Sequence, residues 1–437
     1  AQAEALAREL RQLALALEHA AAFVRQRGGS LADYRARLRE SFAAVMDWAD
    51  PVRTHYPRAI AATWKLSTDR LAPAGVALLR VLSFLAADPV PDFLLDTPIP
   101  RGDDAPEGAE AAQAALAELV AYSLVSRDAA EGRFSMHRLV ADATRRGLAA
   151  DLGRRCLAQA LGWVDTAFVG NGQDVRNWPR LVPLAEHAEA VADRAAEAGI
   201  DDPTARVMND LGVLFDTQVR YDRAERLMRA ALAIAEASLG PDHPNVATHL
   251  SSLAELLRAT NRLAEAEPMF RRALAIDEAS LGPDHPEVAT DLNNLALLLQ
   301  DMGKLGEAEP LSSRALTIDQ VSFAADHPRV ARRLRNLGKI TLDLGRHAEA
   351  EGMLRRALAI DEANVVPHNP DLARDLWYLG LWSRYVGQIA EAESFLARAA
   401  GIHAAFTSAT GVAHADRDKI RSVLAAVSLT LGRTQPE

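Results

Sequence analysis

The stretches "LGPDHPNVAT" (239–248) and "LGPDHPEVAT" (281–290) decide the fold, since they are nearly identical and lie 42 residues apart. The same place recurs as "FAADHPRVAR" (323–332) and, more diverged, as "VVPHNPDLAR" (365–374). Because self-similarity at a fixed period of this length is typical of repeat proteins, the sequence predicts five repeats between about residues 204 and 400. Further residues keep the same step: Leu253, Leu295, Leu337 and Leu379, and the pairs Ala224-Glu225, Ala266-Glu267, Ala308-Glu309, Ala350-Glu351 and Ala392-Glu393.

Each repeat is predicted to fold as two helices. A proline suits the first helical position, where no amide hydrogen is needed, so the preceding residue becomes the N-cap. The second helix carries "AEAEPMFRRALAIDEASLG" (264–282), in which Ala266, Ala273 and Leu274 recur at helical spacing and allow close packing. The predicted N-caps are His243, His285, His327 and Asn369, and the predicted left-handed residues that end the first helices are Asn261, Gly303, Gly345 and Gly387.

The three histidines of the DHP motifs could alternatively bind a metal ion. Helices on successive hairpins are about 10 Å apart, whereas zinc needs its nitrogen ligands about 2 Å from one ion. We therefore expect helix caps at these positions and no metal site.

The repeat half resembles the 42-residue tetratricopeptide (TPR) repeats of kinesin light chains and of many bacterial sensor proteins. The stretch "LNNLALLLQDMGKLGEAEPLSSRALTI" (292–318) is close to that family's consensus. The resemblance implies that the first helices line a concave face, where paired asparagines hydrogen-bond an extended peptide. An amide offers both a donor and an acceptor to a peptide backbone without reading its sequence.

The corresponding positions in this chain form five pairs, of which one retains both asparagines. The alternative for these residues is a polar role at helix contacts or a solvated surface. The five pairs are Asn209-Asp210, Ser251-Ser252, Asn293-Asn294, Arg335-Asn336 and Trp377-Tyr378. As peptide- or protein-binding residues the resemblance implies Asn209, Asp210, Ser252, Asn293, Asn294, Asn336 and Tyr378.

The N-terminal half has a different pattern. A helix pair is predicted over 6–38, broken at Gly28-Gly29 with Ser30 as an N-cap. Apolar helices over 56–71 and 74–95 and a helix over 109–121 follow. Two short strands, 123–128 and 133–137, then precede a helix that begins near Arg138, which is a winged-helix pattern. A loop with Asp174, Asn177, Trp178 and Pro179, and a helix over 180–199, are predicted to bridge the halves.

The order of these segments resembles the region that follows the nucleotide-binding fold in NB-ARC-type (STAND) signal-transduction ATPases. The matching motifs are "RQLALALEHAAAF" (11–23), Thr63-Trp64, "LLRVLSFLAADPVP" (78–91) and Met136-His137-Arg138. The resemblance implies that His137 senses the β-phosphate of ADP, and that ADP or ATP binds the longer parent protein. The alternative is a structural histidine at a strand-to-helix junction. The chain departs from the family at Arg11, Ala14 and Arg138.

Several functions are disfavoured by what the sequence lacks. There is no GxxxxGK[ST] phosphate-binding loop and no GxSxG motif, so we expect no enzymatic activity and no cofactor in this chain. The single cysteine, Cys156, excludes an internal disulfide, and we expect it to be inert. A net charge of -10 argues against nucleic-acid binding. No signal peptide or membrane span is visible, and a cytoplasmic protein is predicted.

The predicted fold class is mainly α: a helical segment (1–50), a winged-helix domain (51–150), a helical bridge (151–203), a TPR α-solenoid (204–400) and a C-terminal capping helix with a tail (401–437). The preferred function is the ligand-sensing and regulatory part of a STAND ATPase. Its partners would be a protein or peptide trigger and an upstream nucleotide-binding domain, with oligomerisation possible on activation. The alternative is a constitutive scaffold without a nucleotide-linked switch. The start at Ala1, within a helical pattern, suggests a piece of a longer protein.

Overall fold

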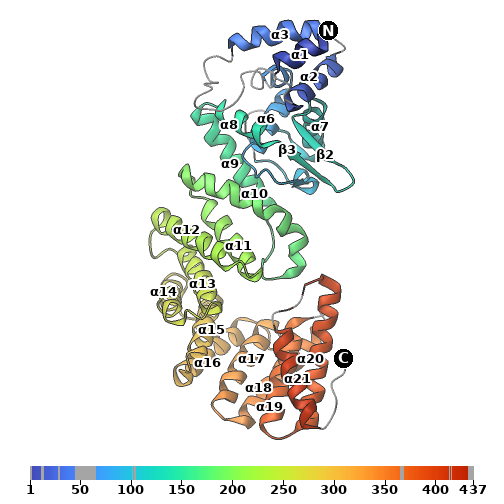
Figure 1. Ribbon diagram of the computed structural model, residues 1–437. Helices are drawn as coiled ribbons and strands as arrows, with labels where there is room; N and C mark the ends of the chain where they lie inside the picture. The colour runs from blue at the N-terminus through green and yellow to red at the C-terminus, as the bar shows by residue number, and fades with distance from the viewer. Residues whose placement is uncertain are drawn as a thin grey trace. The chain divides into compact units, whose positions relative to one another are not determined.

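The computed structural model describes residues 2–10, 14–27, 30–44, 65–100, 102, 105–364, 369–412, 414 and 416–431. The chain forms two compact units, Ala1–Leu214 and Phe215–Glu437, which are treated separately below. Figure 1 labels most of the helices and strands of both units. In the described part of the chain, no helix is both long enough and apolar enough to cross a lipid bilayer.

The first unit begins with α1 (Gln2–Glu9), α2 (Ala14–Arg27) and α3 (Leu31–Ala44). The predicted cap is confirmed, because Ser30 Oγ accepts from the Asp33 amide at 3.1 Å and the Asp33 carboxylate accepts from the Ser30 amide at 3.2 Å. The first member of the predicted helix pair consists of two helices. Both α1 and α2 pack against α3, which two short helices can do and one straight helix cannot.

The next segment contains α6 (Pro73–Leu82), β1 (Val90–Pro91), the 3-10 turn η1 (Asp92–Asp96), α7 (Gly108–Ala121), β2 (Val125–Asp128), β3 (Arg133–Met136) and α8 (Arg138–Arg146). The predicted hairpin between α7 and α8 is confirmed as part of an antiparallel sheet in the order β1-β3-β2. The predicted helix over 74–95 is wrong after Leu82. Pro89 and Pro91 lack the amide hydrogens that a helix requires, and Val90 pairs with Phe134 instead.

The last helices of the first unit are α9 (Ala150–Ala167), the 3-10 turn η2 (Val175–Asn177), α10 (Trp178–Glu197) and most of α11 (Thr204–Thr217), which continues into the second unit after Leu214. Trp178 and Pro179, predicted in a loop, are the first residues of α10, where proline is favoured. The indole of Trp178 donates to the Gly172 carbonyl at 2.9 Å. Trp163 of α9 is fully buried and donates to the Thr97 carbonyl at 2.9 Å, which joins α9 to the segment before α7.

The second unit consists of α12 (Tyr221–Leu239), α13 (Pro244–Ala259), α14 (Leu263–Leu281), α15 (Pro286–Asp301), α16 (Leu305–Ser322), α17 (Pro328–Asp343), α18 (His347–Ala363), α19 (Pro370–Tyr385), α20 (Ile389–Thr410) and α21 (Arg417–Thr430). The four predicted N-caps are confirmed, because each side chain accepts from the backbone amide two residues later. The four predicted turn residues, Asn261, Gly303, Gly345 and Gly387, have positive φ angles between 61° and 81°. The last second helix, α20, extends to Thr410, past the predicted end of the repeats near residue 400.

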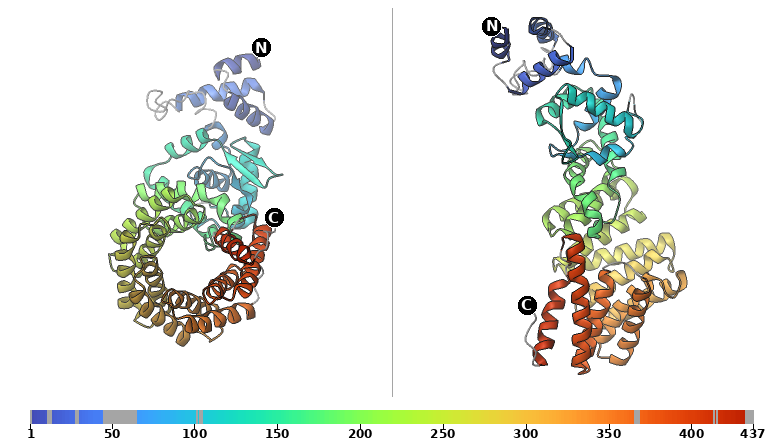
Figure 2. Two further views of the ribbon diagram at one scale, coloured as in Figure 1. Left: turned by 60° about the horizontal axis from the view of Figure 1, so that its bottom comes forward. Right: turned by 90° about the vertical axis from the view of Figure 1, so that its right-hand side faces the viewer.

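The arrangement of first helices (α13, α15, α17, α19) and second helices (α14, α16, α18, α20) follows from side-chain size. Ala266, Ala308, Ala350 and Ala392 of the second helices are fully buried. Successive first helices contact one another directly, whereas contacts between successive second helices are sparser. The array therefore curves toward its first helices, and Figure 2 shows the hairpins following one another along this path.

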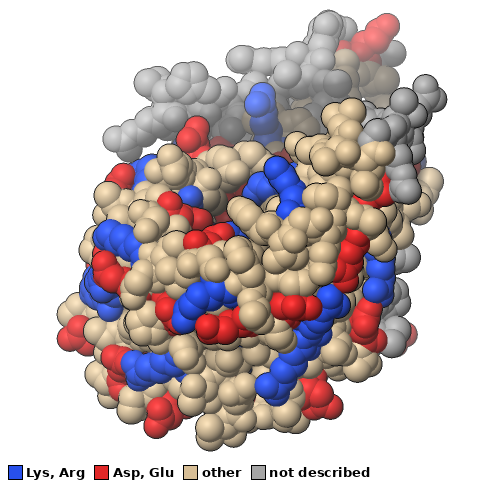
Figure 3. All heavy atoms as spheres, turned by 90° about the horizontal axis from the view of Figure 1, so that it is seen from below, with Lys and Arg blue, Asp and Glu red and all other residues tan. Residues whose placement is uncertain are grey.

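Salt bridges join successive second helices on the outside of the curve. Arg272 pairs with Glu236 at 2.5 Å, Arg314 with Glu278 at 2.6 Å and Arg398 with Glu362 at 2.6 Å. Basic and acidic side chains also interleave on the face of the molecule seen in Figure 3. Because these ion pairs are exposed, each contributes only a few tenths of a kcal/mol, up to about 1 kcal/mol.

Candidate partner-binding surface

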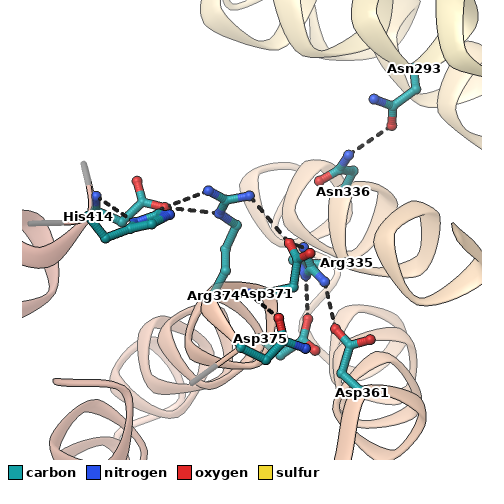
Figure 4. A network of polar contacts seen from close by, with 10 residues as sticks. Asn293, Arg335, Asn336, Asp361, Asp371, Arg374, Asp375 and His414 are labelled. Atoms are coloured by element: carbon teal, nitrogen blue, oxygen red, sulfur yellow. Dashed lines mark hydrogen bonds and ion pairs between the residues drawn. The ribbon is translucent and has the colours of Figure 1, made fainter. Parts of the chain in front are cut away.

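The polar positions of the first helices form the candidate binding surface, here called the first-helix surface. Three of the predicted binding residues lie in one hydrogen-bonded chain across α13, α15 and α17. Asn336 Nδ2 donates to Asn293 Oδ1 at 2.8 Å (Figure 4), Asn293 Nδ2 donates to Asn294 Oδ1 at 3.5 Å, and Asn294 Nδ2 donates to Glu255 Oε1 at 2.9 Å. The structure therefore brings together Asn293, Asn294 and Asn336, which the sequence placed in two different repeats.

These three amides differ in what they can offer to a ligand. Asn293 is 4% exposed and acts within the chain of amides, while Asn294 and Asn336 are half-buried. Among the described residues nothing donates to Asn336 Oδ1, so this amide retains a free acceptor. Asn336 is therefore the member of the chain best placed to hydrogen-bond a peptide backbone.

The other predicted binding residues lie apart from this chain. Ser252 Oγ donates to the Thr248 carbonyl of its own helix at 3.1 Å. Tyr378 is half-buried beside Trp377, with ring centroids 5.2 Å apart, and burial raises the pKa of its phenol. Asn209 and Asp210 belong to α11 in the first compact unit, where Asn209 is buried and burial raises the pKa of Asp210. Ser252 and Tyr378 thus have partners within their own helices, and Asn209 and Asp210 lie in the first compact unit.

Arg335, which shares a pair with Asn336 in the sequence, does not face a ligand. It is 1% exposed and lies among three carboxylates, as Figure 4 shows: Asp371 at 2.7 Å, Asp361 at 2.8 Å, and Asp375. A buried charge needs such partners to offset its lost hydration. In this repeat, therefore, Arg335 of the polar pair lies in the core and Asn336 lies at the surface.

A residue that the sequence reasoning missed is Arg332. Helix α17 carries four arginines within seven residues, 329–335. Arg329 and Arg333 contact Asp319 and Thr290, and Arg335 is held as described above. Arg332 is exposed, and no hydrogen bond or ion pair is found for it within the described residues. It lies one turn before Asn336 on the same face of α17. Desolvation and the neighbouring Arg329 lower the pKa of Arg332, and the carboxylates of Asp371 and Asp319 attract it, so a positive charge without a direct ion pair lies beside the free amide acceptor.

Beneath this surface, two carboxyl groups face each other at the contact between α14 and α15. Asp277 and Asp291 are 8% and 5% exposed. Burial raises the pKa of Asp291 to about 8, and the nearby Asp277 adds to the shift. The Ser251 hydroxyl donates to Asp291 Oδ1 at 3.0 Å. This pair therefore keeps one proton at neutral pH and carries a single negative charge in place of two.

In the first unit, His137 is the N-cap of α8. Its Nδ1 accepts from the Leu139 amide at 3.2 Å, and the residue is exposed. Because Nδ1 is the acceptor, the neutral ring carries its hydrogen on Nε2. Ala14 begins α2, while Arg11, Thr63-Trp64 and Gly28-Gly29 lie outside the described residues.

Cys156 is buried, and burial raises the pKa of its thiol, which makes the thiolate scarce at neutral pH. The described residues contain no group of three or more His, Cys, Asp or Glu side chains that could hold a metal ion.

Comparison with known proteins identifies the repeats. Residues 203–279, 265–311 and 287–363 match the tetratricopeptide repeat family, so the array consists of TPR repeats, a fold that serves as a scaffold for protein–protein interaction. Residues 66–152 match a domain of unknown function, DUF7779. The comparison with curated proteins gives no match.

Solved structures similar to this chain also contain such repeats. A kinesin light chain from Podosopora anserina with nearly identical TPR-like repeats is 22% identical, with a TM-score of 0.40, over 46% of this chain and 94% of that one. BtubC (BKLC) from P. vanneervenii is 28% identical, with a TM-score of 0.43, over 51% and 92%. A STAND protein with a TPR sensor from Pyrococcus horikoshii is 12% identical, with a TM-score of 0.38, over 97% and 70%.

Proposed function

We propose that the chain is the ligand-sensing and regulatory part of a STAND-type ATPase. The repeats bind a protein or peptide trigger on the first-helix surface, and the segment 66–152 contacts a nucleotide-binding domain of the longer protein. The observation that carries the sensing role is the free acceptor of Asn336 beside the unpaired Arg332. Together they fit an extended peptide whose backbone amide meets Asn336 and whose carboxylate meets Arg332.

Selection of binding peptides from a displayed random library tests this role. The wild-type chain should enrich extended peptides with acidic residues. Asn336→Ala should weaken their binding about tenfold, since a hydrogen bond to a charged or buried group contributes about 1.5 kcal/mol. Asn294→Ala should weaken it less, because Asn294 holds Asn336 through Asn293. Arg332→Glu should abolish the preference for acidic peptides.

Arg356→Glu is the matched control. Arg356 is an exposed arginine on the second helix α18, with no partner found among the described residues. This variant should bind the selected peptides like the wild type. If Asn336→Ala and Arg332→Glu also bind like the wild type, the first-helix surface is not the sensor.

The nucleotide-linked part of the proposal rests on the order of the motifs up to Met136-His137-Arg138. Two features of His137 support it. Its exposed Nε2–H can donate to a phosphate, and the helix dipole at the start of α8 favours an anion. Domain 66–152 would then restrain the nucleotide domain in the ADP state, and trigger binding would shift that equilibrium by its differential affinity for the two states.

Calorimetry with ADP on a protein that includes the upstream sequence tests the switch. ADP should bind this longer protein, and His137→Ala should weaken binding at least tenfold. Arg138→Ala, next to the cap, should have a smaller effect. Absence of ADP binding would favour the alternative, a constitutive scaffold in which His137 only caps α8.

A further inference from the structure

Two hydrogen bonds join the neighbouring first helices α13 and α15. Ser251 Oγ of α13 donates to Asp291 Oδ1 of α15 at 3.0 Å. One turn further along both helices, Asn294 Nδ2 of α15 donates to Glu255 Oε1 of α13 at 2.9 Å. The first bond ends on the buried carboxyl pair, and the second belongs to the chain of amides that reaches Asn336. The place of this chain therefore depends on how α13 and α15 approach each other at the carboxyl pair.

The carboxyl pair, Asp277 of α14 and Asp291 of α15, depends on a proton as its partner. No ion pair is found for either residue among the described side chains. Asp277 Oδ1 and Asp291 Oδ2 are buried, and neither accepts a hydrogen bond from the part of the chain that the structure describes. Buried polar atoms require a partner, and two facing carboxyl groups obtain one by sharing a proton.

The corresponding contacts further along the array have a cation instead. In the contact 42 residues later, Arg333 of α17 lies 2.8 Å from Asp319 of α16. In the contact after that, Arg335 of α17 lies 2.8 Å from Asp361 and also contacts Asp375. Ionisation of these carboxyl groups leaves each of them beside a guanidinium. The contact between α14 and α15 has no such compensation.

The charged groups around the Asp277–Asp291 pair do not supply the missing cation. Burial raises the pKa of Asp277, Glu287 in the first turn of α15 raises it further, and His285, the N-cap of α15, lowers it. From α13 the pair receives the neutral hydroxyl of Ser251.

Two arginines of α17 also reach α15, but they are engaged elsewhere. Arg329 and Arg333 contact Thr290 of α15, and both pair with Asp319 of α16. Arg329 additionally lies 3.7 Å from Glu287. The shared proton is therefore what keeps the two carboxyl groups in contact.

We propose that the first-helix surface binds its peptide only while the Asp277–Asp291 pair keeps its proton, so that proton loss at this contact regulates the surface. This inference rests on the proposed function. Two ionised carboxylates repel each other and need water, which they obtain when α14 separates from α15. Because α14 forms a hairpin with α13, α13 moves with it. The bond from Asn294 to Glu255 then breaks, and the amide chain loses its attachment to α13.

The direction of the pH dependence follows from the two states of this contact. In the closed contact, burial and the facing Asp277 raise the pKa of Asp291 to about 8. In the opened contact both carboxyl groups are hydrated and titrate near pH 4. The closed contact therefore binds more protons, and rising pH favours the opened one. Because apparent affinity scales with the closed fraction, peptide binding should be full at pH 6.5 and about tenfold weaker at pH 9.

The probe is an N-acetylated acidic peptide selected on the wild-type chain at pH 6.5. It contains no His, Cys, Lys or Tyr, so none of its groups titrates between pH 6.5 and 9. Fluorescence anisotropy with a pH-insensitive label measures its affinity for the full chain at both pH values. Asp291→Asn and Asp277→Asn each leave at most one charge in the pair, so both variants should bind equally well at the two pH values. Glu287→Gln, which leaves the pair intact, should retain most of the wild-type loss of affinity.

Three outcomes would overturn the proposal, and they separate it from the proposed function. Equal wild-type affinity at pH 6.5 and 9 rejects the regulation and leaves the binding surface in place. An equal loss of affinity in the wild type and in both Asn variants assigns the pH dependence to another group. A selection that enriches no peptide rejects the binding surface itself. Hydrogen exchange at pH 9 is the second measurement, since the α14 and α15 amides should be less protected in the wild type than in Asp291→Asn.

Discussion

Two contacts between successive repeats use the same pair of positions in different ways. Where α14 meets α15, these positions hold Asp277 and Asp291; one repeat later, where α16 meets α17, they hold Asp319 and Arg333, 2.8 Å apart. The first pair avoids two adjacent negative charges by keeping a proton, and the second forms a buried salt bridge. The same repeat position can therefore hold an aspartate or an arginine, because a retained proton offsets the charge in one repeat and an ion pair offsets it in the next.

A third contact combines both cases. Asp361 and Asp375 occupy the same positions where α18 meets α19, and Arg335 of α17 lies between them. The cation comes from the position that holds Asn293 in the repeat before. The same repeat position therefore joins the chain of hydrogen-bonded amides when it holds Asn293, and lies among buried carboxylates when it holds Arg335.

The largest effect is expected from removing this cation. Arg335→Met should destabilise α17–α19 by about 3–5 kcal/mol, because it leaves buried carboxylates without their partner. The loss should be smaller at pH 5 than at pH 8, since the third contact would then resemble the first and could keep a proton. Hydrogen exchange of the α17–α19 amides, measured by mass spectrometry at both pH values, gives the local stability.

Lys339→Met is the control for this change. Lys339 belongs to the same helix, and its salt bridge with Asp343 at 2.5 Å is partly exposed. Its loss should cost less than about 1 kcal/mol. If the α17–α19 amides are equally protected from hydrogen exchange in the two variants, the buried Arg335 network contributes no more stability than a partly exposed salt bridge.

Sequence reasoning predicted the helices of the array well and the neutralising partners poorly. Period, proline and glycine positions are local signals, and they gave the N-caps at His243 and His285 correctly. The role of Arg335 could not be read from its repeat position, because its partners Asp361 and Asp375 lie 26 and 40 residues away. The same holds for the pairing of Asn293 with Asn336, which depends on how neighbouring first helices approach. In the first unit, the prediction of one helix over 74–95 was wrong because two prolines interrupt this apolar stretch and end the helix early.

An intermediate effect is expected at the protonated pair. Its folded-state pKa of about 8 lies above the value of about 4 in the unfolded chain. The folded state therefore binds more protons between these pH values, and its stability falls as the pH rises toward 8. Asp291→Asn, which is neutral at all pH values, should remove this slope and stabilise α14 and α15 at pH 8 by about 1–3 kcal/mol.

Urea denaturation of the full chain at pH 6 and pH 8.5 measures this slope, with hydrogen exchange locating it to α14 and α15. Glu287 and His285 also lie near the pair, so Glu287→Gln serves as a control for a neighbouring exposed charge. It should leave most of the pH dependence in place. If Asp291→Asn retains the wild-type slope, the two carboxyl groups do not share a proton in the folded chain.

The smallest effect is expected from removing the Ser251 hydroxyl, which hydrogen-bonds to this carboxyl pair. Ser251 Oγ donates to Asp291 Oδ1 at 3.0 Å from the preceding first helix, and this bond favours the charged form of Asp291. Ser251→Ala should therefore raise the pKa of Asp291 further and cost about 0.5–1.5 kcal/mol, mostly above pH 8 where the carboxylate needs a donor. The adjacent Ser252→Ala should change stability less, because its hydroxyl donates only within its own helix. A pH titration of both variants by carboxyl-carbon NMR separates a shift in the Asp291 pKa from a general loss of stability, since only the first variant should move that signal's midpoint.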